Sequence, residues 1–172
     1  GYGTGGTVSG VGRVLREKSP GTKIILTEPE NAALIGSELK QDRHSDNTPA
    51  TSHSSWNPHL IQGWTPDFIP FVLQEAIDNN YFDKLLPVSG EQGITWAKRL
   101  ARAEGIITGI SGGSTFAIAM EVAKDAPPDS NILCMLPDTG ERYLSSPLFE
   151  EIPEEMTDDE KKISLSTPNY QL

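Results

Sequence analysis

Hydrophobic and polar positions alternate along the chain in a way that predicts helices separated by short strands. Apolar residues recur at helical spacing over residues 6–16, with Val8, Val11 and Val14 on one stripe. A polar turn follows, and a row of apolar residues then predicts a buried strand over residues 23–30. This order of glycine-rich loop, helix, turn and strand is typical of an α/β protein with a parallel sheet.

The same reasoning extends along the rest of the chain. Helices are predicted over residues 71–79, 91–102 and 116–124, and strands over residues 83–89 and 132–136. In the second of these helices, apolar side chains fill one arc of the helical wheel, and Lys98, Arg99 and Arg102 fill the other. That helix therefore has one face for the core and one basic face for solvent.

Two segments are predicted to be loops. Residues 37–58 are polar, with little to bury beyond Leu39 and Trp56, so they form an expanded surface loop of the kind that often acts as a lid or a binding loop. Residues 106–107 are apolar and lead into a loop of small residues over 109–114. This second loop repeats the arrangement at the start of the chain, where glycines also precede a helix.

Composition restricts the class of protein. The length of 172 residues suits one domain. The net charge of −10 argues against a nucleic-acid or anionic-membrane surface, because basic patches bind those partners. No apolar run is long enough for a membrane span. Much of the acidity lies near the end, so residues 151–172 are predicted to be a solvated tail, with one short helix near residues 157–162.

Cys134 is the only cysteine and lies in an apolar run. No disulfide can form within the chain, which favours a reducing compartment, either the cytoplasm or the interior of an organelle. We expect a buried structural thiol, because apolar surroundings raise the pKa of a thiol. The three histidines, His44, His53 and His59, have no clean metal-ligand spacing, so no metal site is expected.

The opening GYGTGGT is the segment with the clearest chemistry. Glycines let a backbone approach a ligand closely, and the unpaired N–H groups at a helix N-terminus bind anions with the help of the helix dipole. Thr4 and Thr7 can add hydroxyl donors. The segment therefore predicts a phosphate site, with a purely structural glycine turn as the alternative.

A dinucleotide is one possible source of that phosphate. Residues 1–6 match G-x-G-x-x-G, and Glu28 ends the next predicted strand, where an acidic residue would bind a ribose hydroxyl. These features favour a Rossmann-type oxidoreductase. The Walker pattern is absent, because no Gly-Lys-Ser/Thr follows the glycines.

A second interpretation comes from four segments that resemble, in order, the pyridoxal-phosphate enzymes of the cysteine synthase family, which includes O-acetylserine sulfhydrylase and cystathionine β-synthase. The segments are GYGTGGTVSGVGRVLRE at 1–17, HLIQGWTPDFIP at 59–70, EGIITGISGGS at 104–114 and LPDTGERYLSS at 136–146. The resemblance implies pyridoxal 5′-phosphate as the cofactor. It also implies the fold of the fold-type II group, a three-layer α/β structure with a mostly parallel sheet and helices on both faces. Residues 1–150 would be the C-terminal, cofactor-binding portion of that fold.

The family's cofactor contacts are implied for the residues that match its motifs. The loop residues that would grip the phosphate are Gly3, Thr4, Gly5, Gly6 and Thr7. The family also places a hydroxyl residue at the pyridine nitrogen, in the turn after the last strand, where this chain has Asp138 and Thr139. Both stay candidates, and Thr139 is favoured. A neutral hydroxyl leaves the ring nitrogen unprotonated, which favours β-elimination over reactions that need a full carbanion.

The resemblance also implies a substrate pocket and a missing segment. The pocket residues are Gln62, Gly63, Trp64, Gly109 and Ser111. The family's reactive lysine, which forms a Schiff base with the cofactor, has a Ser/Thr-x-Lys-x-Arg-like context that no lysine in this chain shares. We therefore expect this chain to be the C-terminal half, inactive alone, which works with the N-terminal half of the same enzyme in a homodimer.

The implied activity is β-replacement on a small amino-acid substrate, making cysteine from O-acetylserine and sulfide. Within the family, the alternatives are a cystathionine β-synthase-like activity and plain elimination to pyruvate. Two other classes stay open: the Rossmann oxidoreductase described above, and a non-catalytic homologue that binds a partner through its acidic tail.

Overall fold

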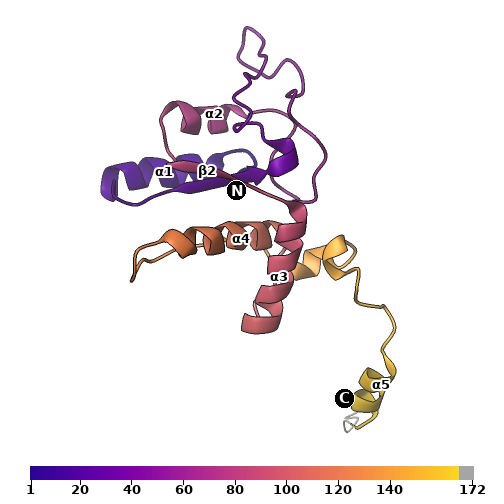
Figure 1. The fold of residues 1–172 in the computed structure, drawn as a ribbon. Coiled ribbons are helices and arrows are strands. Elements are labelled where there is room, and N and C mark those ends of the chain that lie inside the picture. The colour runs from indigo at the N-terminus through magenta and orange to yellow at the C-terminus, as the bar shows by residue number, and fades with distance from the viewer. Residues whose placement is uncertain (167–172) are drawn as a thin grey trace, which may run out of the picture.

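The computed structural model describes residues 1–166, which alternate between helices and strands (Figure 1). The longer elements are α1 (Gly6–Lys18), β1 (Ile25–Pro29), α2 (Phe71–Asp78), β2 (Lys84–Val88), α3 (Gly90–Glu104), α4 (Ile110–Asp125) and α5 (Asp158–Ser166). Three short 3₁₀ helices are η1 (Glu30–Ala32), η2 (Gly140–Tyr143) and η3 (Pro147–Phe149). The predicted helices over 71–79 and 91–102 and the predicted strands over 23–30 and 83–89 are confirmed.

β1 and β2 form a parallel pair with helices on both faces. The register runs from Ile25 opposite Lys84 to Pro29 opposite Val88. Because side chains alternate along a strand, Leu26 packs on one face with α1 and α2, and Val88 packs on the other with α3 and α4. Figure 1 shows the first two helices on one side and the other two on the opposite side. The predicted α/β class, with helices on both faces of a parallel sheet, is confirmed.

The third predicted strand, over residues 132–136, is wrong. Residues 131–137 have no regular secondary structure, and the side chain of Leu133 is 95% exposed. Ile132 and Met135 are also exposed. A strand needs a neighbour for its N–H and C=O groups. Within the described residues, no strand pairs with this run, so its apolar pattern has no sheet to join.

The small-residue segment at 109–114 is a helix start, not the loop that was predicted. Gly109 is the N-cap of α4, so the helix begins well before residue 116. The small side chains are used for helix packing, because Gly93 of α3 and Gly113 of α4 touch. A methyl carbon added at Gly113 would lie 2.0 Å from the Gly93 carbonyl oxygen. The two helices are therefore in backbone contact where they cross (Figure 1).

The predicted apolar stripe of α1 does not face the core. Val8 is buried, whereas Val11 and Val14 are 44% and 52% exposed. The buried face of α1 continues instead through Ser9 and Gly12. A methyl carbon on Gly12 would lie 2.4 Å from Tyr81 Cβ, so the helix packs closely there because the side chain is absent.

After residue 152 the chain extends away from the rest of the molecule (Figure 1). Residues 151–166 are exposed throughout, and α5 overlaps the short helix predicted near residues 157–162. Residues 167–172 of that predicted tail lie outside the described residues. Cys134 is half-buried instead of fully buried, and burial raises the pKa of its thiol, as expected for an unreactive cysteine.

Candidate functional site

The glycine-rich opening is a tight loop that ends at the N-terminus of α1. Gly5 caps the helix with a left-handed backbone (φ 89°), and its carbonyl accepts a hydrogen bond from Ser9 N at 2.9 Å. Among the described residues, no carbonyl accepts a hydrogen bond from the amides of Gly5, Gly6 or Thr7. Gly6, Thr7 and Thr4 are exposed to solvent. Unpaired amides at the positive end of a helix dipole form a site for an anion.

Close packing shapes the walls of this loop. A methyl carbon on Gly3 would lie 2.6 Å from the Gly63 carbonyl oxygen, and one on Gly5 would lie 2.6 Å from Leu73 Cα. Both contacts are with backbone, which cannot move aside as a flexible side chain does. The opening loop therefore keeps its path only with glycine at these positions.

Thr65 holds the second motif segment against the opening loop. Its amide donates to the Tyr2 carbonyl oxygen at 2.8 Å. Its own carbonyl accepts from Trp56 Nε1 at 3.0 Å and lies 3.2 Å from His59 Nε2. Thr65 is buried and has a left-handed backbone (φ 37°), which is unfavourable for a β-branched residue. These contacts hold a strained turn in place beside the opening loop.

The predicted pocket residues Gln62, Gly63 and Trp64 lie next to the opening loop. Gln62 and Gly63 are exposed, and Gly63 contacts the opening loop as described. Trp64 is half-buried and packs against the hydrophobic cluster that contains Ile110 and Tyr143. The cluster therefore joins the segment around residue 63 to the start of α4 and to η2.

The other predicted residues gather at the start of α4. Tyr143 donates a short hydrogen bond from its hydroxyl to Asp138 Oδ2, and Thr108 Oγ1 donates to the Asp138 carbonyl oxygen at 3.2 Å. Asp138 Oδ1 is buried and has no hydrogen-bond partner among the described residues. A methyl carbon on Gly109 would lie 2.7 Å from that oxygen and 2.3 Å from the Tyr143 ring. Gly109 thus leaves the space in which Asp138 and Tyr143 meet.

Asp138 and Thr139 have different surroundings. The Asp138 carboxylate is turned inward to Tyr143, whose pKa is raised to about 12, first by burial and then by this hydrogen bond. Thr139 is exposed, and its hydroxyl lowers the pKa of the neighbouring Glu141. Ser111 is buried in the first turn of α4. Of the two candidates for the pyridine nitrogen, Thr139 is the one with an accessible hydroxyl.

Glu28 has a role that the sequence did not predict. It is 1% exposed, and its carboxylate accepts hydrogen bonds from Tyr2 Oη at 2.6 Å, Ile35 N at 3.1 Å and Gly36 N at 2.8 Å. Burial, and then the carboxylate, raise the pKa of Tyr2 above its ordinary value. The interpretation of Glu28 as a ribose ligand is wrong, because the carboxylate is buried and used by the protein itself. The sequence offered one signal, an acidic residue within an apolar strand.

The predicted long loop is anchored to the second half of the second motif segment, residues 65–70. Arg43 Nη2 donates to the Ile69 carbonyl oxygen at 2.7 Å, and Ile69 N donates to Gln41 Oε1 at 3.0 Å. Ser52 Oγ donates to Asp67 Oδ2 at 2.5 Å. The loop therefore packs against residues on the same side as Thr65. No periodicity in the sequence could have indicated these contacts.

Over residues 1–166, no group of three or more histidine, cysteine and acidic side chains could hold a metal ion. In the same range, no helix combines the length and the apolar character that a membrane span needs.

Comparison with known proteins places the chain in a family. The model of the family described as "Pyridoxal-phosphate dependent enzyme" matches residues 1–138. O-ureido-L-serine synthase from Streptomyces lavendulae is 40% identical over 167 residues, which are 97% of this chain and 45% of that protein. A cysteine synthase from Staphylococcus aureus is 35% identical over 149 residues, which are 87% of this chain and 42% of that protein.

Solved structures agree with these relatives. The crystal structure of O-ureido-L-serine synthase superposes with a TM-score of 0.75 at 38% identity, over 94% of this chain and 45% of that one. Cysteine synthase from Entamoeba histolytica superposes with a TM-score of 0.69 at 30% identity, over 98% and 44%. The chain belongs to the pyridoxal-phosphate dependent enzyme family, and its resemblance to the cysteine synthase group is confirmed. It spans less than half the length of these relatives.

Proposed function

We propose that this chain supplies the phosphate grip and part of the substrate pocket of a pyridoxal-phosphate-dependent β-replacement enzyme. The observation that supports this most directly is the opening loop, where backbone amides meet threonine hydroxyls at the start of α1. The backbone contacts at Gly3 and Gly5 fit a cradle built for a small anion. The residues that hold the phosphate are Gly3, Thr4, Gly5, Gly6 and Thr7.

The residues around the site favour the use of pyridoxal 5′-phosphate for removing a β-substituent from an amino acid. When bound, the cofactor supplies an electron sink for breaking bonds at the α- and β-carbons of an amino acid. The amides and hydroxyls of the opening loop bind its phosphate and fix its position. Thr139 presents a neutral hydroxyl to the ring nitrogen, and Tyr143 keeps the Asp138 carboxylate turned away. A neutral partner limits the sink and favours loss of a β-substituent.

The proposed substrate is O-acetylserine. Its acetate leaves the β-carbon, and a nucleophile forms the new bond to that carbon while losing a proton. The residues proposed for the substrate pocket are Gln62, Gly63, Trp64, Gly109 and Ser111. With sulfide as the nucleophile, the products are cysteine and acetate. A cystathionine β-synthase-like reaction or elimination to pyruvate are alternatives with the same first stage.

A second candidate product follows from one comparison. O-ureido-L-serine synthase is 40% identical to this chain. The name of its product describes a serine oxygen attached to a ureido nitrogen, as hydroxyurea and O-acetylserine would give with release of acetate. The half-buried Trp64 gives the proposed pocket a large aromatic side chain. Hydroxyurea is therefore proposed as the alternative nucleophile.

The complete enzyme is proposed to be a homodimer in which the reactive lysine comes from outside this chain. Without that lysine, the chain would have the proposed phosphate grip but no residue for the covalent attachment of the cofactor. We therefore expect residues 1–172, alone, to bind cofactor weakly and to have no β-replacement activity.

The phosphate assignment is tested with the full-length gene product. Thr7→Val should weaken binding of pyridoxal phosphate by about tenfold or more, since a hydrogen bond to a charged group contributes about 1.5–3 kcal/mol. Binding of unphosphorylated pyridoxal should be unchanged. Thr51→Val, at an exposed position in the long loop, is the matched control. Equal effects of Thr7→Val on the two vitamers would overturn the assignment.

The nucleophile is tested separately. Full-length protein with O-acetylserine is supplied with sulfide or with hydroxyurea, and products are identified by mass spectrometry. Cysteine as the dominant product supports the first proposal, and O-ureidoserine supports the second. Pyruvate alone in both reactions would refute β-replacement.

A further inference from the structure

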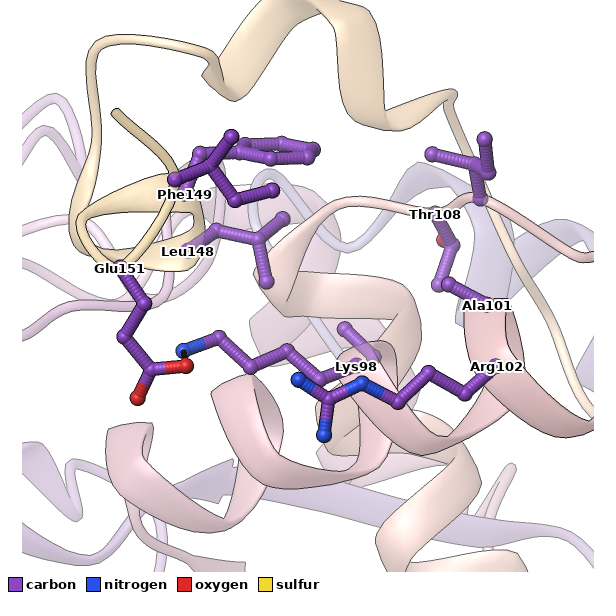
Figure 2. A pocket seen from close by; sticks show the side chains of 10 residues that line it. Lys98, Ala101, Arg102, Thr108, Leu148, Phe149 and Glu151 are labelled. Atoms are coloured by element: carbon purple, nitrogen blue, oxygen red, sulfur yellow. Dashed lines mark ion pairs between the residues drawn. The ribbon is translucent and has the colours of Figure 1, made fainter. Parts of the chain in front are cut away.

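A cavity of about 190 Å³ lies between α3, the segment leading into α4 and the chain around η3 (Figure 2). Its apolar walls include Ile107, Leu148 and Phe149, and its charged side chains are Lys98, Arg102 and Glu151. Ligand sites for drug-sized molecules measure about 300–1,000 Å³. This cavity therefore suits a small metabolite. It shares none of the predicted cofactor or substrate residues.

The charges in this cavity are unbalanced. Lys98 and Arg102 are one turn apart on α3, so they lie on the same face. Lys98 Nζ pairs with Glu151 Oε2 at 3.1 Å. Arg102 has no ion pair or hydrogen bond with any of the described residues. Two cations one turn apart repel each other. Because Glu151 pairs with Lys98 only, Arg102 remains available to an anion.

Geometry separates the polar and apolar sides of the cavity. Figure 2 shows the charged ends of Lys98, Arg102 and Glu151 gathered on one side, with Leu148 and Phe149 on the other. Glu151 uses one carboxylate oxygen for Lys98, and its other oxygen has no partner among the described residues. The side chain of Glu151 is 69% exposed, so that oxygen is accessible. A ligand would meet a guanidinium, a free carboxylate oxygen and an apolar wall.

We propose that this cavity binds a free α-amino acid with an aliphatic or thioether side chain. Its carboxylate pairs with Arg102, whose planar guanidinium can form two parallel hydrogen bonds to it. Its ammonium pairs with the free oxygen of Glu151. Its side chain covers Ile107, which is 53% exposed. This arrangement gives Arg102 and Glu151 each a partner of opposite charge, and it removes apolar surface from water.

Other ligand classes fit less well. A plain fatty acid would leave the Glu151 oxygen unpaired, and an inorganic anion would leave the apolar wall exposed to water. An apolar amine would have no use for Arg102. The amino acid is the class that uses all three features. The inference concerns binding in a separate cavity, so it does not depend on the proposed reaction.

Calorimetric titration of the full-length protein tests the proposal directly, in the absence of added O-acetylserine. L-leucine and L-methionine are expected to bind with dissociation constants of about 0.01–1 mM, typical for ligands of this size. Three analogues each lack one recognised group: 4-methylpentanoate lacks the ammonium, 3-methylbutylamine lacks the carboxylate, and glycine lacks the side chain. Each should bind at least about tenfold more weakly than L-leucine.

Variants identify the cavity. Arg102→Gln and Glu151→Gln should each weaken L-leucine binding by about tenfold or more, and Arg102→Lys should restore part of the affinity. Arg13→Gln is the matched control, because Arg13 is exposed on α1 with no ion pair among the described residues. Thermal unfolding of each variant checks the fold. Three results would overturn the proposal. The first is no saturable binding of either amino acid, and the second is binding that Arg102→Gln leaves unchanged. The third is a change of oligomeric state instead of binding.

Discussion

Replacing Gly5 by alanine tests whether the opening loop depends on its exact backbone path. Two penalties add at this position. The left-handed backbone (φ 89°) costs a residue with a Cβ about 1–2 kcal/mol. The new methyl group would lie 2.6 Å from Leu73 Cα and N, and forcing extra volume into packed structure costs about 1–3 kcal/mol. We expect Gly5→Ala to lower the free energy of unfolding by about 2–5 kcal/mol.

Two further glycines separate these penalties. Gly63 also has a left-handed backbone (φ 80°), but nothing lies within 4 Å of an added methyl carbon. Gly63→Ala should therefore cost only the backbone part, about 1–2 kcal/mol. Gly10 lies inside α1 with open space around it and no left-handed backbone. Gly10→Ala should stabilise the protein by about 0.5–1 kcal/mol.

Urea denaturation of full-length protein, followed by circular dichroism, measures the three variants. The expected order of stability is Gly10→Ala, wild type, Gly63→Ala and then Gly5→Ala. Titration with pyridoxal phosphate on the same samples should show the greatest loss of affinity for Gly5→Ala. If Gly5→Ala were as stable as Gly63→Ala, the close contact with Leu73 would not contribute to the destabilisation. If it were as stable as wild type, the described loop would be wrong.

Three other substitutions test separate features of the fold. Tyr2→Phe removes the donor to the buried Glu28 carboxylate and should cost about 1–3 kcal/mol of stability in urea denaturation. The pKa of Asp83 is lowered by the Ile24 amide and then by Arg16. Asp83 therefore contributes to the stability of the fold above the ordinary carboxyl pKa, and this contribution is lost as pH falls through the lowered pKa. Asp83→Asn should therefore destabilise the protein at neutral pH and flatten the loss of stability on acidification; a parallel acid curve would contradict this. Ser89→Ala removes the capping box of α3 and should lower the melting temperature, at a cost of about 1 kcal/mol.

Local signals in the sequence were sufficient for most elements. The apolar row after residue 23 gives β1, and the amphipathic pattern over residues 91–102 gives α3, because each pattern depends on neighbours a few residues away. The opening loop was recognisable as a candidate anion site for the same reason. Its glycines and threonines stand together in the sequence, and α1 follows directly.

Features that depend on distant partners were not predictable. The buried face of α1 is decided by Tyr81, which contacts Gly12 from far along the chain. The role of Glu28 depends on Tyr2 and on the amides after η1. Residues 109–114 were interpreted as a loop because glycine and serine are poor helix formers, whereas contact between α3 and α4 requires small residues there.

The exposed apolar segment at residues 131–137, which has no regular secondary structure, affects how the polypeptide behaves during biosynthesis. Its backbone has no neighbouring strand among the described residues, and Leu133 projects into solvent. An apolar segment whose backbone N–H and C=O groups are unpaired tends to associate with other newly made chains. We therefore expect this exposed run to make the polypeptide prone to aggregation while it is being synthesised.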